Sequence, residues 1–187
     1  MELQSGTVGA VGRRRMLGLS GAAAVTGVLG WSGAARAAVG APRTLRFESV
    51  HTDECLEVTY WRDGRYLREA LRAIDYHLRD FRTGDVLPID SLLLDLLHAV
   101  NTRLDNRAPL LVISGYRSPA TNAMLAARSP NVSKTSLHMR GMAIDVRLPD
   151  VPLATLRDTG LELGWGGVGY YPDDKFVHLD TGPVRAW

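Results

Sequence analysis

The chain has 187 residues, a formal net charge of +2 and a single cysteine. Residues 1–37 hold four arginines and one glutamate, so the rest of the chain carries a net charge of about −1 (2 − 3). This balance excludes nucleic-acid binding through bulk positive charge, and a single cysteine excludes an intramolecular disulfide. The about 150 remaining residues (187 − 37) suffice for one domain with its own core.

Residues 1–37 are typical of an export signal. A basic stretch at residues 13–15 precedes an apolar stretch at residues 16–31, and the small-residue run Ala35-Arg36-Ala37 offers a cleavage site. We therefore expect a signal peptide at 1–37 and one domain at 38–187. The apolar stretch is too short to predict a membrane-spanning helix, and an uncleaved N-terminal anchor is the alternative.

The paired arginines, followed by Met16 and Leu17, resemble the twin-arginine export signal, which is an address read by a receptor. That resemblance implies a bacterial protein of the periplasm or cell envelope that is exported after folding. Once the signal is removed, we expect no stable insertion into the membrane.

The first half of the predicted domain mixes strands and helices. Residues 45–50 and 55–60 are β-favouring runs joined by a polar turn, which predicts an N-terminal hairpin. Apolar residues then recur at steps of four and three, which predicts an amphipathic helix: Leu67, Leu71, Ile74, Leu78 and Phe81. Asp90 is a candidate N-cap for a deeply buried helix that runs to about Leu104.

The second half continues the mixture. Residues 109–114 predict a buried strand, and Ser118 with Pro119 predicts the start of a helix that runs to about Arg128. A strand at 141–148 and a short helix between Pro152 and Gly164 follow. Two runs, 167–171 and 176–180, predict a closing hairpin. Because there is no regular βαβ alternation, the pattern favours the α+β class.

Strand alternation singles out three polar residues. In residues 141–148, Asp145 lies on the face opposite to the apolar side chains, and His178 does the same in 176–180. His138 stands just before the first of these strands. The three would form a metal site with an open position, because zinc accepts imidazole nitrogen and carboxylate oxygen, and catalytic zinc sites commonly use three protein ligands plus water. Spacing alone leaves open that they are scattered polar residues.

Three segments together resemble the LAS metallopeptidases, a family that includes lysostaphin, D-Ala-D-Ala carboxypeptidases and hedgehog: SGYRSPATN, SLHMRGMAIDV and GGVGYYPDDKFVHLDTGPVRAW. The likeness is greatest to the YcbK-like murein endopeptidases and covers essentially the whole chain. It implies an α+β domain in which a small antiparallel sheet carries the zinc site and helices pack on one side.

The resemblance also assigns roles to individual residues. The family pattern His-x6-Asp, followed later by a histidine, falls on His138, Asp145 and His178, and implies one Zn2+ per chain. Arg117 matches the arginine of the family and would bind a substrate carboxylate or stabilise a developing oxyanion. The alternative for Arg117 is a surface arginine whose stem covers apolar surface.

One departure from the family concerns the general base. Many carboxypeptidases of this superfamily carry a glutamate three residues before the last histidine, and others a histidine two before it. Here those positions hold Lys175 and Phe176. Asp180, on the same strand face as His178, would take the proton of the attacking water or orient the ligand histidine.

We therefore expect a zinc-dependent peptidase that hydrolyses peptide cross-links of peptidoglycan. A D,D-carboxypeptidase acting on stem peptides is the alternative with the same fold. A non-haem iron oxygenase shares the two-histidine, one-carboxylate ligand set. A non-catalytic, zinc-stabilised wall-binding module is the last alternative.

Residues outside this set carry weaker expectations. We expect Cys55 to be a small core residue. Four aromatic residues are candidates for either the wall of a cleft or the core: Trp165, Tyr170, Tyr171 and Trp187. Asn122 is a weaker candidate for the cleft.

Overall fold

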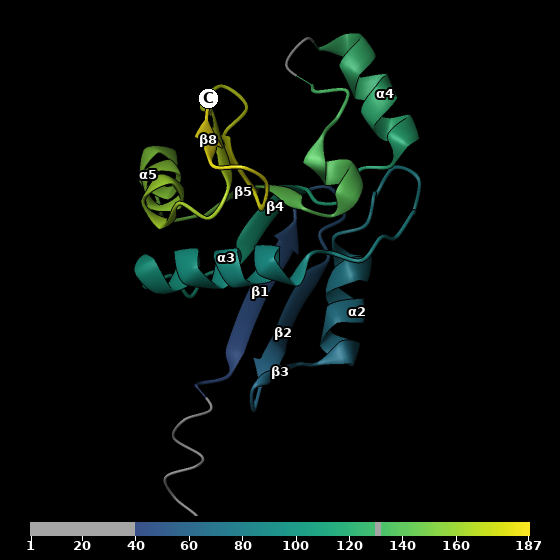
Figure 1. Ribbon diagram of the computed structural model, residues 1–187. Helices are drawn as coiled ribbons and strands as arrows, with labels where there is room; N and C mark the ends of the chain where they lie inside the picture. The colour runs from purple at the N-terminus through teal and green to yellow at the C-terminus, as the bar shows by residue number, and fades with distance from the viewer. Residues whose placement is uncertain (1–39, 130–131) are drawn as a thin grey trace, which may run out of the picture.

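The computed structural model describes residues 40–129 and 132–187 (Figure 1). The predicted signal at 1–37 lies outside the described residues and stays a prediction. None of the helices in the described part of the chain has the length and apolar character that crossing a bilayer requires.

One mixed sheet forms the framework. Within the described residues it has eight strands in the order β3-β2-β1-β4-β5-β7-β6-β8. The strands are β1 (Arg43–Ser49), β2 (Cys55–Arg62), β3 (Arg65–Tyr66), β4 (Leu110–Ser114), β5 (Ala143–Arg147), β6 (Gly167–Tyr171), β7 (Phe176–Asp180) and β8 (Arg185–Ala186). Both predicted hairpins are present, as β1–β2 and β6–β7. The α+β class is confirmed.

The sheet is larger than the small antiparallel sheet that we expected. The N-terminal hairpin joins it because β1 pairs with β4, and this pair is parallel, as is β6 with β8. The remaining pairs are antiparallel. The site-bearing strands β5 and β7 therefore lie inside the sheet, with neighbours on both sides.

The helices are α2 (Arg68–His77), α3 (Ser91–Arg103), α4 (Pro119–Arg128), α5 (Leu153–Leu163) and the 3-10 helix η1 (Leu137–Arg140). Two predicted N-caps are confirmed: Asp90 accepts a hydrogen bond from the Leu92 amide (3.0 Å), and Ser118 accepts one from the Thr121 amide (3.2 Å). The short helix α5 begins after Pro152 and ends at Gly164, which has a φ of 64°.

Helix α2 ends at His77, so it does not reach Phe81 as the apolar spacing had predicted. The Leu78 carbonyl accepts a hydrogen bond from the Tyr116 amide (2.7 Å) and so is used outside the helix. Gly115 packs against the same residue so closely that a Cβ there would lie 2.5 Å from the Leu78 oxygen. The chain after α2 is thereby tied to the segment that follows β4.

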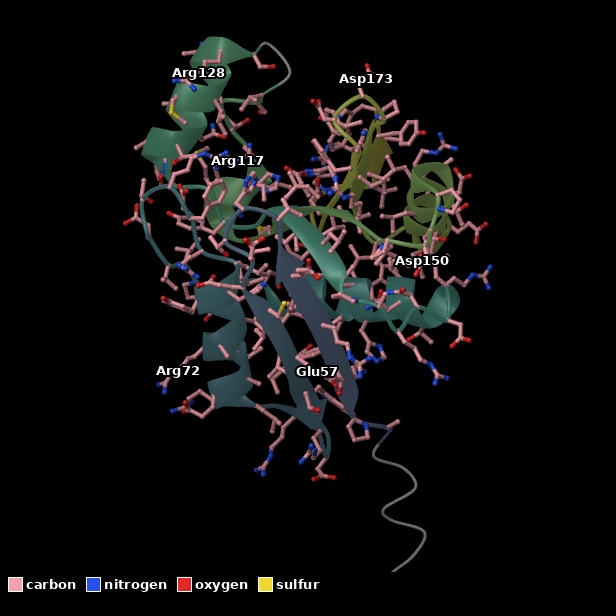
Figure 2. All side chains as sticks on the ribbon, turned by 180° about the vertical axis from the view of Figure 1, so that it is seen from behind. Glu57, Arg72, Arg117, Arg128, Asp150 and Asp173 are labelled. Atoms are coloured by element: carbon pink, nitrogen blue, oxygen red, sulfur yellow. The ribbon has the colours of Figure 1, made fainter. Side chains whose placement is uncertain are left out.

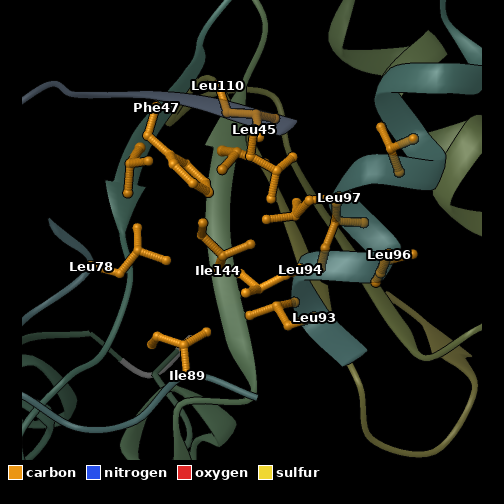
Figure 3. Close-up of a cluster of buried hydrophobic side chains, with 14 of the residues drawn as sticks. Leu45, Phe47, Leu78, Ile89, Leu93, Leu94, Leu96, Leu97, Leu110 and Ile144 are labelled. Carbon is orange, nitrogen blue, oxygen red and sulfur yellow. The ribbon is translucent and has the colours of Figure 1, made fainter. Parts of the chain in front are cut away.

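Helices α2, α3 and α5 pack on one face of the sheet, and α3 crosses its front in Figure 1. The buried leucines of α3 meet the apolar side chains of the strands in one core (Figure 3). The deep burial predicted for this helix is confirmed. The labelled members of the core are Leu45, Phe47, Leu78, Ile89, Leu93, Leu94, Leu96, Leu97, Leu110 and Ile144.

The core also directs the polar side chains of the central strands. Ile144 and Val146 of β5, and Val177 and Leu179 of β7, are buried in it. Residues that alternate with them must face away from the helices. The expectation for Cys55 was wrong: its side chain is exposed, because it opens β2 opposite Glu48 on the outer side of the hairpin.

Candidate metal centre

Three buried side chains converge from three elements. His138 lies in η1, Asp145 in β5 and His178 in β7, and the register of the β5–β7 pair sets Asp145 opposite His178. The Nε2 atom of His138 lies 3.2 Å from Asp145 Oδ1 and 3.2 Å from His178 Nδ1. The Nδ1 atom of His178 lies 2.8 Å from Asp145 Oδ1. The structure thus brings together all three predicted metal ligands.

Hydrogen bonds on the outer side of each imidazole determine where the protons lie. The Nδ1 atom of His138 is 2.7 Å from the Gly115 carbonyl, which can only accept, so Nδ1 carries the proton and Nε2 keeps a lone pair. The Nε2 atom of His178 donates in the same way to Asp180 Oδ2 at 3.0 Å, so its Nδ1 is the atom that faces Asp145. Two imidazole nitrogens and a carboxylate oxygen therefore face one point, an arrangement that a cation would stabilise.

The pKa values of the three side chains also indicate that the cluster favours a positive charge at its centre. Burial lowers the pKa of His138 and would lower that of His178, but hydrogen bonds to Asp145 and Asp180 raise the pKa of His178 to about 9. Burial would raise the pKa of Asp145, yet the two histidines hold it well below its usual range. Without a metal the cluster retains one proton, which a bound cation would displace.

The donor set fits zinc in its dimensions as well as its chemistry. Zinc bonds to nitrogen and oxygen are about 2.0–2.1 Å long, so tetrahedral donors lie roughly 3.3 Å apart. The three separations here are 2.8 to 3.2 Å. No large movement of the side chains is needed to bind such an ion.

Asp180 stands behind His178. Its Oδ1 accepts from the amides of Gly167 (3.0 Å) and Gly182 (2.8 Å), and its Oδ2 accepts from His178 and from Arg185 (2.7 Å). These bonds hold the pKa of Asp180 well below its usual range, although burial opposes the shift. The residue is 0% exposed, so its carboxylate does not reach solvent in the cleft.

Arg117 contacts the opposite side of Asp145. Its Nη2 atom lies 3.1 Å from Asp145 Oδ2 and 3.3 Å from the Ser114 hydroxyl. Its Nε–H is buried and has no hydrogen-bond partner among the described residues. The Arg117 side chain also lines the cleft described next.

A cleft of about 680 Å³ opens above the three donors, and all three line it. Of the four aromatic candidates, Tyr171 and Trp187 line the cleft, whereas Trp165 and Tyr170 do not. Trp187 donates from its indole nitrogen to the Tyr171 hydroxyl (2.6 Å), and its ring centroid lies 5.3 Å from that of His178. Asn122 is absent from the lining and donates to the Ser133 carbonyl (3.0 Å).

Sequence reasoning missed several residues of the site. His51, Arg82 and Asp174 line the cleft, and the buried Asp80 accepts a hydrogen bond from the Ser118 amide at 2.9 Å, next to Arg117. They come from turns and loops in which no periodic pattern marks a face. The neighbouring Asp80–Ser118 contact spans 38 residues, so local spacing does not predict it.

Fold and site together define an α+β protein with a buried cluster of metal-ligand type at the floor of a cleft. The chain belongs to the family described as peptidoglycan L,D-endopeptidase MepK, whose model matches residues 37–187. This membership confirms the resemblance seen in the sequence.

Curated relatives match over nearly their full length. The peptidoglycan L,D-endopeptidases MepK of Escherichia coli strain K12 and of Shigella flexneri are each 39% identical over 176 residues, covering 94% of this chain and 96% of theirs. The probable peptidoglycan L,D-endopeptidase MepK of Haemophilus influenzae is also 39% identical, over 94% of this chain and 95% of its own.

We predict that His178→Ala sharply reduces the zinc content of the purified protein, because a three-ligand site loses one of its protein donors. Elemental analysis after dialysis measures the metal, and His98→Ala, in α3, is the matched control that should keep it. Stoichiometric zinc in the His178 variant would contradict the assignment. Iron in place of zinc after anaerobic purification would favour the facial-triad alternative.

Proposed function

We propose that the protein is a zinc-dependent peptidase that cleaves peptide cross-links of peptidoglycan, at an L,D bond like that named for its relatives. The convergence of two imidazole nitrogens and a carboxylate oxygen on one point at the floor of an open cleft carries this proposal. A purely structural site would not need to face a cavity large enough for a peptide.

His138, Asp145 and His178 would hold the zinc ion. When bound, zinc acts as a Lewis acid, which lowers the pKa of water to about 7 and polarises a carbonyl. The Gly115 carbonyl and Asp180 keep the two imidazoles in the tautomers that metal binding requires.

Arg117 and Asp180 take different roles in this proposal. The guanidinium of Arg117, a residue that lines the cleft, is suited to stabilise the oxyanion that develops on the scissile carbonyl. Asp180 is a positioning residue for His178, because its oxygens are occupied and shielded from the cleft. The general base would therefore be a group that reaches the cleft.

Whole peptidoglycan sacculi, digested with purified protein with and without a chelator, test the activity. Soluble fragments should appear only without the chelator, and their masses should correspond to cleavage within cross-links. Release of single D-alanine residues from free pentapeptides instead would identify a carboxypeptidase. Binding to sacculi with no release of fragments would support the wall-binding alternative.

We predict that Asp180→Asn weakens zinc affinity by about 10- to 100-fold, with activity returning at excess zinc, because a misaligned His178 binds the metal less well. Zinc titration and cross-link cleavage are measured on the same preparation. If zinc binding persists while the rate falls by roughly 10²–10⁴, Asp180 is the general base instead.

Arg117→Ala is the matched comparison, since Arg117 contacts Asp145 of the three-donor cluster, whereas Asp180 contacts His178. It should retain zinc, because all three ligands remain, and lose about 10²–10³ in kcat. A change confined to KM would assign Arg117 to uniform substrate binding.

We also propose that the chain reaches the periplasm or cell envelope by the twin-arginine route, given the residues at 13–17. Replacing Arg13 and Arg14 together by lysine should leave precursor in the cytoplasm, measured by fractionation and immunoblotting. An unchanged periplasmic level would show that another route carries the protein.

A further inference from the structure

A stack of three side chains, two of which line the cleft, lies at the end of the cleft next to β1. The guanidinium carbon of Arg82 lies 4.1 Å from the centroid of the Phe81 ring, and that ring stacks on His51 with centroids 4.2 Å apart. Arg82 and His51 both line the cleft that holds the three donors. Tyr171, in β6, and Trp187, directly after β8, line it from the other end of the strand order.

The backbone of Arg82 is fixed by the carboxylate that also fixes the start of α4. Asp80 accepts from the Arg82 amide through Oδ1 (3.1 Å) and from the Ser118 amide through Oδ2 (2.9 Å). Ser118 directly follows Arg117. One buried carboxylate therefore fixes the backbone at Arg82 and next to Arg117, and both arginines line the same cleft.

The two arginines differ in how their charges are balanced. Arg117 pairs with Asp145 at 3.1 Å, and the third arginine of the cleft, Arg185, pairs with Asp180 at 2.7 Å. Arg82 makes no ion pair and no side-chain hydrogen bond with any residue of the described chain; its only polar contact there is through its backbone amide. Its guanidinium is held above the Phe81 ring and its five N–H donors remain available.

Arg82 and Arg117 line the same cleft, and the charge of Arg117 acts on Arg82. Burial lowers the pKa of Arg82 first, and the charge of Arg117 lowers it further, while Asp80 opposes both. An arginine remains charged despite such a shift. Two guanidinium groups that line one cleft, one of them without an ion-pair partner among the described residues, favour an anionic ligand between the cleft walls.

We infer that Arg82 determines specificity by binding a free carboxylate of the substrate next to the scissile amide. The inference rests on the proposed function and names its substrate class: a cross-linked peptide in which the carbon bearing the scissile nitrogen also carries an unamidated carboxyl group. An L,D bond joins the carbonyl of an L centre to the nitrogen of a D centre. When that nitrogen belongs to a side-chain cross-link, the carboxyl group of the D centre stays free.

Arginine suits this role because its planar fork binds both oxygens of a carboxylate, and such charge-assisted pairs are stronger than neutral hydrogen bonds. The contact is made equally in the bound substrate and during the reaction, since the carboxylate takes no part in bond breaking. Its loss should therefore raise KM and leave kcat nearly unchanged.

The test compares wild type and Arg82→Gln on two synthetic cross-linked peptides that differ only in this carboxylate, free or amidated. Wild type should lose roughly 10- to 100-fold in kcat/KM on amidation. On the free peptide, the kcat/KM of Arg82→Gln should lie below that of wild type by a similar factor. Amidation of the peptide should then lower the kcat/KM of this variant little further. Arg72→Gln is the matched control, because Arg72 lies on the outer side of α2, away from Arg117 (Figure 2).

Additive losses, in which amidation costs the Arg82 variant as much as it costs wild type, would overturn the inference. Calorimetric binding of the same two peptides to chelator-treated protein makes the comparison without catalysis. If wild type cleaves neither peptide, the proposed function fails, and the binding data still decide the role of Arg82. Equal affinity of wild type for both peptides would then reject the carboxylate contact.

Discussion

The register between β5 and β7 is the constraint on which the site depends. It places Asp145 opposite His178 and Val146 opposite Val177, so the acid and the imidazole share one face while the valines share the other. A slip by one residue would turn His178 into the core and Val177 into the cleft. Because β4 and β6 flank the pair, and the core side chains interlock beneath it, such a slip would have to disrupt most of the sheet.

Two glycines that pack closely against their neighbours add a second constraint around the donors. A Cβ at Gly115 would lie 2.5 Å from the Leu78 carbonyl oxygen, and one at Gly167 would lie 2.5 Å from Asp180 Oδ2. The Gly115 carbonyl accepts the imidazole proton of His138, and Gly167 contacts Asp180, which accepts that of His178. The proton positions at the donors thus depend on residues with no side chain, which no inspection of charged or polar residues would find.

The sequence predicted what alternation and local chemistry determine. Asp145 and His178 face away from the core because neighbouring residues are apolar, and the caps at Asp90 and Ser118 follow from short-range hydrogen bonding. The parallel β1–β4 pairing and the early end of α2 arise from contacts between distant segments, which periodicity does not encode. The placement of Arg82 has the same origin, since the carboxylate of Asp80 also binds the segment after β4.

The insertion of β7 between β5 and β6 has a consequence for biosynthesis. A nascent chain that has emerged only as far as β6 contains His138 and Asp145 but lacks His178, and its central sheet cannot close. Tight binding of a metal at this site would then await the completed fold, because two unfixed donors bind weakly. The first metal ions that such a site could bind would be those of the compartment in which β7 enters the sheet, wherever the protein later acts.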